Sequence, residues 1–151
     1  MNETGFKQNF RDSIEKHTDG FIWTVNDMFS VGNPDLMISQ KGRFFGVEAK
    51  YAKKLPARDG SLLSSAAPLS VKQRLFLARI HNTGNYGLIL MGFEGDIFIA
   101  IPIYAWPMGE SHIRVNQALQ LKQEGFYFEL SKMERFFETI RVKYDHKQIL
   151  L

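Results

Sequence analysis

The amino-acid sequence predicts an α/β domain in which a mixed central sheet is flanked by helices. Residues 3–17 carry a helical stripe of apolar side chains at Phe6, Phe10 and Ile14. Three short segments rich in aromatic and β-branched residues follow as strands, at 21–25, 35–39 and 43–51. Residues 86–93 are continuously apolar, which is typical of a strand buried on both faces and often parallel to its neighbour.

The connections between these elements are marked by turn and capping residues. Thr18-Asp19-Gly20 ends the first helix, and Gln40-Lys41-Gly42 joins two of the strands as a tight turn. Residues 55–68 form a long connection without periodicity, a kind that is usually functional or mobile. Ser70 then caps a second helix that ends at Asn82-Thr83-Gly84. We expect the apolar face of this helix to consist of Val71, Leu75, Phe76, Ala78 and Ile80.

The last third of the chain predicts further mixed structure. We expect strands at 96–102 and 127–130, and helices at 113–123 and 131–140, the latter with Ser131 and Glu134 as a capping box. The order of elements up to residue 93 is αβββαβ. At 151 residues the chain fits one domain, with a core over about 3–93 and a C-terminal α+β extension over about 94–151.

Composition excludes several classes of protein. The chain is 44% hydrophobic and 23% charged, as in ordinary folded proteins. It has no cysteine, which excludes disulfides, a thiolate metal site and a thiol nucleophile. No apolar run is long enough to span a bilayer, and the start lacks the pattern of a signal peptide. We therefore expect no membrane partner and a cytoplasmic protein of a bacterial or phage-infected host cell.

Positive charge is concentrated in one part of the chain. Residues 41–79 contain nine lysines and arginines against Glu48 and Asp59, a local charge of +7. The whole chain has a net charge of +3, so the remainder carries −4. Such segregation indicates a polyanionic partner, although a solvated basic surface explains it equally well.

Asp35, Glu48 and Lys50 form the main chemical pattern. If residues 35–39 and 43–51 pair as antiparallel strands, Asp35 and Glu48 converge near one end of the sheet. Because side chains alternate along a strand, Glu48 and Lys50 lie on the same face. Carboxylates of this kind hold Mg²⁺, and a neighbouring lysine orients the attacking water or stabilises the transition state of phosphodiester hydrolysis. The alternative is a surface salt bridge between Glu48 and Lys50.

Four short motifs resemble the PD-(D/E)XK nuclease superfamily. They are Gly32-Asn33-Pro34-Asp35-Leu36, Gly42-Arg43-Phe44-Phe45, Val47-Glu48-Ala49-Lys50 and Leu69-Ser70-Val71-Lys72-Gln73. The pattern is most similar to virus-type replication-repair nuclease (VRR-NUC) domains and next to archaeal-type Holliday junction resolvases. The resemblance covers about residues 3–93. It implies a restriction-endonuclease-like fold with the αβββαβ core.

The resemblance also implies a role for individual residues. Asp35 and Glu48 would bind the metal together with the backbone carbonyl of Ala49, and Lys50 would be the catalytic lysine. Gln73 would brace the site, the alternative being a solvent-facing helix residue. These families place an acidic residue on the first helix. We favour Glu3 for it over Glu15, because Glu3 lies on the apolar stripe.

Other residues are candidates for contact with the DNA backbone. They are Lys53, Lys54, Arg58, Lys72, Arg74, Ser30 and Asn33. For each of them a solvated surface position is an equally good explanation. The four histidines have no metal-ligand spacing and are interpreted as structural or surface residues.

These observations predict a Mg²⁺-dependent DNA endonuclease, with Mn²⁺ as a possible substitute. The chain leaves little room for a sequence-reading module, so we expect selectivity for branched DNA such as Holliday junctions in replication, repair or recombination. Cutting both strands of a junction needs two sites and thus a homodimer. Aromatic segments at 103–106 and 133–137 are candidates for its interface or for the core. The alternatives are an exonuclease, a nicking restriction-like enzyme, or a non-catalytic DNA-binding protein that retains the fold.

Overall fold

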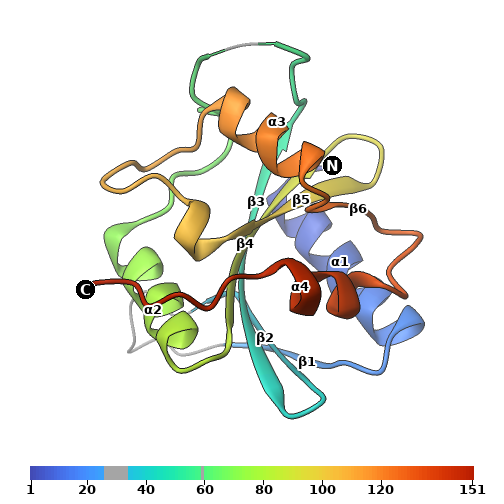
Figure 1. The fold of residues 1–151 in the computed structure, drawn as a ribbon. Helices are drawn as coiled ribbons and strands as arrows, with labels where there is room; N and C mark the ends of the chain where they lie inside the picture. The colour runs from blue at the N-terminus through green and yellow to red at the C-terminus, as the bar shows by residue number, and fades with distance from the viewer. Residues whose placement is uncertain (26–33, 59) are drawn as a thin grey trace.

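The computed structural model describes residues 1–25, 34–58 and 60–151. Their helices and strands form one six-stranded sheet with helices on both faces (Figure 1). The helices are α1 (Glu3–His17), α2 (Val71–Asn82), α3 (Val115–Gln123) and α4 (Phe136–Lys143), with a short 3-10 turn, η1 (Ile103–Ala105). The strands are β1 (Phe21–Thr24), β2 (Leu36–Gln40), β3 (Arg43–Lys53), β4 (Tyr86–Phe93), β5 (Ile97–Pro102) and β6 (Tyr127–Glu129).

The sheet follows the chain in the order β1-β2-β3-β4-β5-β6. All neighbouring pairs are antiparallel except β3 and β4, which are parallel. A parallel pair needs a crossover, and α2 provides it. The predicted αβββαβ order, mixed sheet and fully buried fourth strand are therefore confirmed. Lys41 and Gly42 both have positive φ in the predicted turn between β2 and β3, as a two-residue hairpin turn requires.

α1 and α2 cover opposite faces of the sheet (Figure 1). Phe6 of α1 lies against Gly92 of β4, whereas Leu77 of α2 lies against Gly87 on the same strand. Positions 87 and 92 differ by an odd number, so they point to opposite faces. β3 is divided in the same way, because Tyr51 contacts Phe6 while Gly46 faces α2. Glu48 and Lys50 stand two and four residues after Gly46 on the strand, so their side chains point to the same face, which is the one covered by α2.

Two paired glycines let α2 approach the sheet closely. Gly46 and Gly87 are partners in the register of β3 and β4. A Cβ atom on Gly46 would lie 2.5 Å from Ile80, and one on Gly87 would lie 2.5 Å from the carbonyl oxygen of Leu77. Side chains at these positions would hold the helix off the sheet. The absence of side chains there sets the distance between α2 and the strand that carries Glu48.

The buried face of α2 differs from the predicted one. Leu77, Ala78 and His81 are buried, whereas Val71 and Leu75 are exposed. The apolar residues of this helix thus form two stripes, and only the one containing Leu77 faces the sheet. The predicted cap at Ser70 and the end at residues 82–84 are confirmed.

The connection before α2 contains no helix, as predicted, but it is packed on the protein. Leu63, Ala66 and Leu69 are buried. Leu62 forms an isolated β-bridge with Arg114, and the Leu63 amide donates a 2.8 Å hydrogen bond to the carbonyl oxygen of Ile113. These contacts fix the start of α2 relative to the segment before α3.

The C-terminal part continues the same sheet. β5 and β6 extend it beyond β4, and α4 packs on the face of α1, where Phe136 contacts Phe10. The prediction of a helix over 131–140 was wrong in its start, because α4 begins at Phe136. Residues 131–135 instead form turns that bury Met133. The aromatic segments at 103–106 and 133–137 supply core residues, namely Ile103, Trp106, Met133, Phe136 and Phe137.

Among the described residues, no helix is both long and apolar enough to cross a membrane.

Candidate active site

Asp35 lies immediately before β2, where β2 and β3 separate. Leu36 is paired with Val47, so the chain places Asp35 beside the residues that follow Val47 on β3. Asp35 Oδ2 accepts a 3.0 Å hydrogen bond from the backbone amide of Ala49. This contact fixes the carboxylate next to the Glu48-Ala49-Lys50 segment, as the strand pairing predicted.

Glu48 lies in the middle of the sheet and is only 3% exposed. Its Oε1 accepts a 2.8 Å hydrogen bond from Gln73 Nε2 and lies 3.7 Å from Lys50 Nζ. Its Oε2 is buried and has no hydrogen-bond partner among the described residues. An unpaired buried carboxylate oxygen is costly, so such an atom calls for a ligand or a proton.

The environment of Glu48 favours its protonated form. Burial is the largest cause, and the negative charge of Asp35 adds to it, whereas Lys50 acts in the opposite direction. Together these effects raise the pKa of Glu48 to about 8. Two carboxylates that share a site disfavour each other's charge, and a bound cation removes that conflict.

Gln73 connects α2 to the carboxylates. It is the third residue of the helix, and its side-chain Oε1 accepts a 2.9 Å hydrogen bond from the Ser70 amide. The Ser70 hydroxyl in turn accepts a 3.1 Å bond from the Gln73 amide, which completes a capping box. The Gln73 Nε2 group remains free to hold Glu48. The alternative of a solvent-facing Gln73 is thereby excluded.

Lys7 is a member of this group that the sequence analysis did not include. Its Nζ lies 3.4 Å from Asp35 Oδ1. A signal for it exists in the sequence, because Lys7 stands three residues before Phe10 and seven before Ile14. Those intervals place it on the stripe of α1 that faces the sheet.

Glu3 does not join the two carboxylates. It is half-buried on α1, one helical turn before Lys7. Among the described residues no three acidic or histidine side chains come together as a metal-binding group. The helix therefore presents Lys7 to Asp35, and it leaves Glu3 apart from the site. Glu15 lies on the exposed side and pairs with Arg11 at 3.4 Å.

The candidate DNA-contacting residues are spread around the molecule. Lys53 is exposed and lies 4.0 Å from Glu94, and Lys54, Arg58 and Lys72 are exposed as well. Arg74 lines an apolar hollow on the outer side of α2. Ser30 and Asn33 lie outside the described residues. None of these contacts tests a role in DNA binding, which stays a prediction.

His81 has a structural environment. It is buried, with its Nδ1 atom 2.7 Å from the Tyr144 hydroxyl and its Nε2 atom 2.6 Å from the carbonyl oxygen of Lys147. His146 packs on the same aromatic cluster. These contacts agree with the interpretation of the histidines as structural or surface residues.

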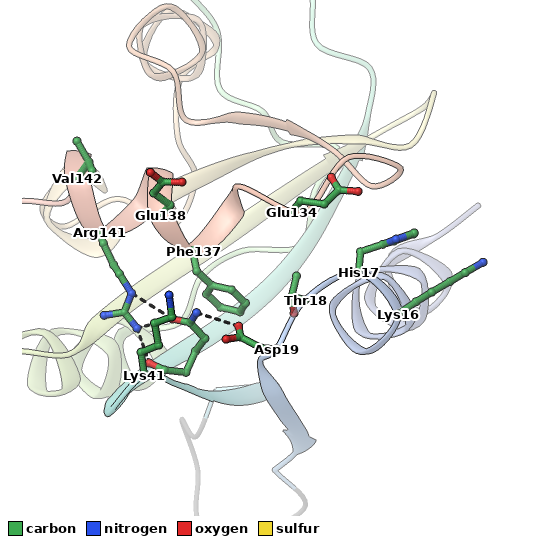
Figure 2. Close-up of a pocket in the computed structure, with 11 residues that line it drawn as sticks. Lys16, His17, Thr18, Asp19, Lys41, Glu134, Phe137, Glu138, Arg141 and Val142 are labelled. Atoms are coloured by element: carbon green, nitrogen blue, oxygen red, sulfur yellow. Dashed lines mark hydrogen bonds between the residues drawn. The ribbon is translucent and has the colours of Figure 1, made fainter.

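A hollow of about 840 Å³ lies between the end of α1, the β2–β3 turn and α4 (Figure 2). It is lined by both signs of charge, including Asp19, Lys41, Glu134 and Arg141. Three of its polar side chains are paired with one another, because Gln40 donates a 3.0 Å hydrogen bond to Asp19 and accepts one from Arg141. It contains neither Asp35 nor Glu48, so we place the candidate site at the carboxylates and not here.

The residues present fit a divalent cation. The oxygen donors are the carboxylates of Asp35 and Glu48, including the buried and unpaired Glu48 Oε2, and the backbone carbonyl of Ala49. Mg²⁺ and Mn²⁺ prefer oxygen ligands of this kind. The adjacent Lys50 supplies positive charge next to the carboxylates.

The fold and the arrangement of strands define a restriction-endonuclease-like α/β protein. No protein-family model matches the chain, and no curated protein matches it significantly. Among solved structures the chain is similar to Hjc, a Holliday junction resolvase from the archaeal hyperthermophile Archaeoglobus fulgidus. The TM-score is 0.60 at 13% sequence identity, and the match covers 87% of this chain and 98% of that one. At this identity the likeness defines the fold, and the resemblance to VRR-NUC domains stays a prediction.

Proposed function

We propose that this protein is a metal-dependent nuclease that hydrolyses phosphodiester bonds of DNA. The observation that carries the proposal is the convergence of Asp35 and Glu48 beside Lys50, with Glu48 Oε2 buried and unpaired. A structural salt bridge alone does not explain this oxygen, because a simple Glu48–Lys50 pair leaves no reason to bury a second carboxylate oxygen without a partner.

Each side chain then has a defined task. Asp35, Glu48 and the Ala49 carbonyl would hold the cation, Mg²⁺ or in its place Mn²⁺. The bound cation would acidify water and offset the negative charge that builds on the phosphoryl oxygens. Lys50 orients the attacking water or stabilises those oxygens from the buried side. Gln73 keeps the Glu48 carboxylate in one orientation through its 2.8 Å hydrogen bond.

For the substrate we propose branched DNA, acted on in replication, repair or recombination. Two observations support this choice. The fold is similar to that of a Holliday junction resolvase. The helices and strands of the described residues all belong to the sheet or to the layers that cover it, so these residues contain no separate sequence-reading module. Selectivity would then arise from the shape of the DNA backbone, for which exposed Lys53, Lys54 and Lys72 are suited.

We further propose that the active form is a homodimer, because cutting both strands of a junction needs two sites. Exposed apolar side chains beside α2 offer a surface for the second copy. They surround a hollow of about 250 Å³, and Met108 in its lining is 91% exposed. Leu75, Leu150 and Leu151 belong to the same lining. Light scattering on the purified protein tests this assembly, and Leu75→Glu should shift a dimer toward monomer while Thr4→Glu, at an exposed position on α1, should not.

The decisive experiment is a cleavage panel. Labelled four-way junction, flap, duplex and single strand are incubated with Mg²⁺, with Mn²⁺ and with EDTA. We expect cleavage of the junction with either metal and none with EDTA. Asp35→Asn and Glu48→Gln should abolish cutting while circular dichroism shows an intact fold. Cutting at the normal rate by both variants would show that the site is assigned wrongly.

The same panel separates the alternatives. An exonuclease releases mononucleotides or short products from DNA ends, and it fails on a closed circular substrate that an endonuclease cuts. A nicking enzyme cuts one strand of a plain duplex. A non-catalytic DNA-binding protein retains the junction in a gel-shift assay but cuts no substrate with any metal, and this last result would overturn the proposed function.

A further inference from the structure

Lys7 and Lys50 flank the two carboxylates from different sides. Lys50 lies 3.7 Å from Glu48 and its side chain is 5% exposed, so it is enclosed by the sheet and α2. Lys7 lies 3.4 Å from Asp35 and its side chain is 31% exposed. The site therefore has one lysine that is locked in place and one that is reachable from solvent.

Buried neighbours hold the backbone at Lys7, whereas its side chain is partly exposed. The preceding residue, Phe6, packs on Tyr51 and Phe98 with ring centroids 6.2 and 5.9 Å away. Phe10 packs one turn later on Phe98 and Phe136. Since α1 is fixed by these buried rings, the Lys7 side chain always starts near Asp35. Its four-carbon stem allows the charged end to move by several ångströms without any change in the helix.

The contact with Asp35 uses an oxygen that a metal would also need. Asp35 Oδ2 accepts a hydrogen bond from the Ala49 amide at 3.0 Å, and Oδ1 is the oxygen turned toward α1. The Lys7 ammonium group donates a 3.4 Å hydrogen bond to Asp35 Oδ1. A divalent cation on Oδ1 and the Lys7 ammonium are like charges in one place, so they compete for it.

We propose that Lys7 exchanges partners, holding Asp35 in the metal-free protein and a phosphate group of DNA once a divalent cation occupies Asp35. This inference rests on the proposed function. The ammonium group displaced from Asp35 lies at the exposed mouth of the site, where the DNA backbone would approach. Lys50 is enclosed, so its ammonium group is not exposed to DNA that arrives from solvent. The exchange couples the two ligands, because metal binding releases the group that then binds phosphate.

The first test is metal affinity without DNA. Mn²⁺ binding is measured by isothermal titration calorimetry on the intact protein, Lys7→Ala and Lys7→Arg. Removal of the competing cation should make Lys7→Ala bind Mn²⁺ about two- to fivefold more tightly, the range expected for a partly exposed ion pair. Lys16→Ala, which removes an exposed lysine elsewhere on α1, should leave the affinity unchanged.

The second test is the salt dependence of DNA binding. Junction affinity is measured in Ca²⁺, chosen to hold the site without supporting cleavage, over a range of NaCl concentrations. Loss of one phosphate contact lowers the slope of log Kd against log salt by about 1. We expect this change for Lys7→Ala and its restoration in Lys7→Arg, whereas Lys16→Ala keeps the slope of the intact protein.

The outcomes separate this inference from the proposed function. Equal or weaker Mn²⁺ binding by Lys7→Ala, or an unchanged salt slope, would overturn the exchange and leave Lys7 as a fixed brace of Asp35. Cleavage by the intact protein would still support the nuclease in that case. If the intact protein binds no Mn²⁺, both proposals fall together. Should Lys7→Ala fold poorly, Lys7→Gln provides the same comparison with the stem retained.

Discussion

Gln73 donates a 2.8 Å hydrogen bond to Glu48 with the same side-chain amide that caps α2 at Ser70. One residue thus joins the start of a helix to a buried carboxylate at the centre of the sheet. The conformation of the N-terminus of α2 and the orientation of the Glu48 side chain therefore depend on each other. This linkage explains why a polar side chain at this position faces inward.

Gln73→Ala should therefore damage stability and metal binding together. It removes half of the capping box and leaves Glu48 Oε1 without its amide partner, for a loss of about 1–3 kcal/mol. Ser70→Ala is the matched control, because it breaks the cap while Gln73 keeps its contact with Glu48. Urea unfolding and Mn²⁺ titration measure the two effects. Equal Mn²⁺ affinity in both variants would contradict a bracing role for Gln73.

Lys50→Met should separate catalysis from folding. The lysine is buried beside Glu48, and a methionine of similar length fills its place but leaves Glu48 without its cationic partner, so the melting temperature should fall while the fold is retained. Loss of the ammonium should slow cleavage by about 10²–10⁴-fold. Lys16→Met, at an exposed position on α1 with no proposed role in the site, should cut normally. The single-turnover cleavage rate measures the effect on catalysis, and the melting temperature measures the effect on stability. A normal cleavage rate in Lys50→Met would exclude a catalytic role for Lys50.

The raised pKa of Glu48 predicts a pH-dependent stability in the absence of metal. The folded protein keeps this proton up to about pH 8, whereas an ordinary glutamate carboxyl group, as in the unfolded chain, has a pKa of 4.5. The folded state thus binds more protons than the unfolded one between these values, so stability is lost as pH rises through this window. The loss is at most about 1.4 kcal/mol for each pH unit.

Glu48→Gln should flatten this dependence, because its side chain does not titrate. Urea unfolding at several pH values in EDTA gives the comparison. Added Mg²⁺ should restore stability at high pH in the intact protein, since a bound cation favours the charged carboxylate. Identical pH profiles for the two proteins would contradict the raised pKa.

Gly87→Ala should lift α2 from the sheet. The new methyl group would meet the backbone oxygen of Leu77 at 2.5 Å, and a backbone atom within a helix cannot move aside alone. We expect destabilisation of about 1–3 kcal/mol and weaker Mn²⁺ binding, because Gln73 moves away from Glu48. Gly60→Ala is the control, with only ordinary contacts at 3.7 Å. Wild-type stability in Gly87→Ala would show that α2 has more freedom than its packing indicates.

Arg141→Ala should loosen α4 without touching the carboxylates. The Arg141 guanidinium group donates hydrogen bonds to the side chain and the backbone carbonyl of Gln40 (Figure 2). It also lies 5.6 Å from the ring centroid of Phe45. Its loss leaves buried Gln40 with fewer partners and should cost about 2–3 kcal/mol in urea unfolding. Val142→Ala, at an exposed position, should cost little. Cleavage at a temperature where the variant is folded should remain normal, and a specific loss of activity would contradict a purely structural role.

Local patterns predicted most of the fold because they report on burial directly. The stripe of Phe6, Phe10 and Ile14 and the apolar run at 86–93 both match the structure. The start of α4 was missed because a capping pattern at Ser131 competes with tertiary contacts. The Ser13 hydroxyl donates to the carbonyl of Leu130, and Met133 is fully buried in a turn. Packing against α1 decides that segment, and no local signal records it.

By itself the sequence predicted the antiparallel strand pair that brings Asp35 near Glu48 and Lys50, because two short strands flank a turn at residues 40–42 and side chains alternate along each strand. It also predicted the chemistry that we propose, since carboxylates and a lysine are the residue types that metal-assisted phosphodiester cleavage uses. Only the tertiary structure decided what surrounds them. The burial that raises the pKa of Glu48, the inward amide of Gln73 and the approach of Lys7 all arise where α1 and α2 pack on opposite faces of one sheet. These effects depend on distances between segments far apart in the chain, which sequence spacing does not encode.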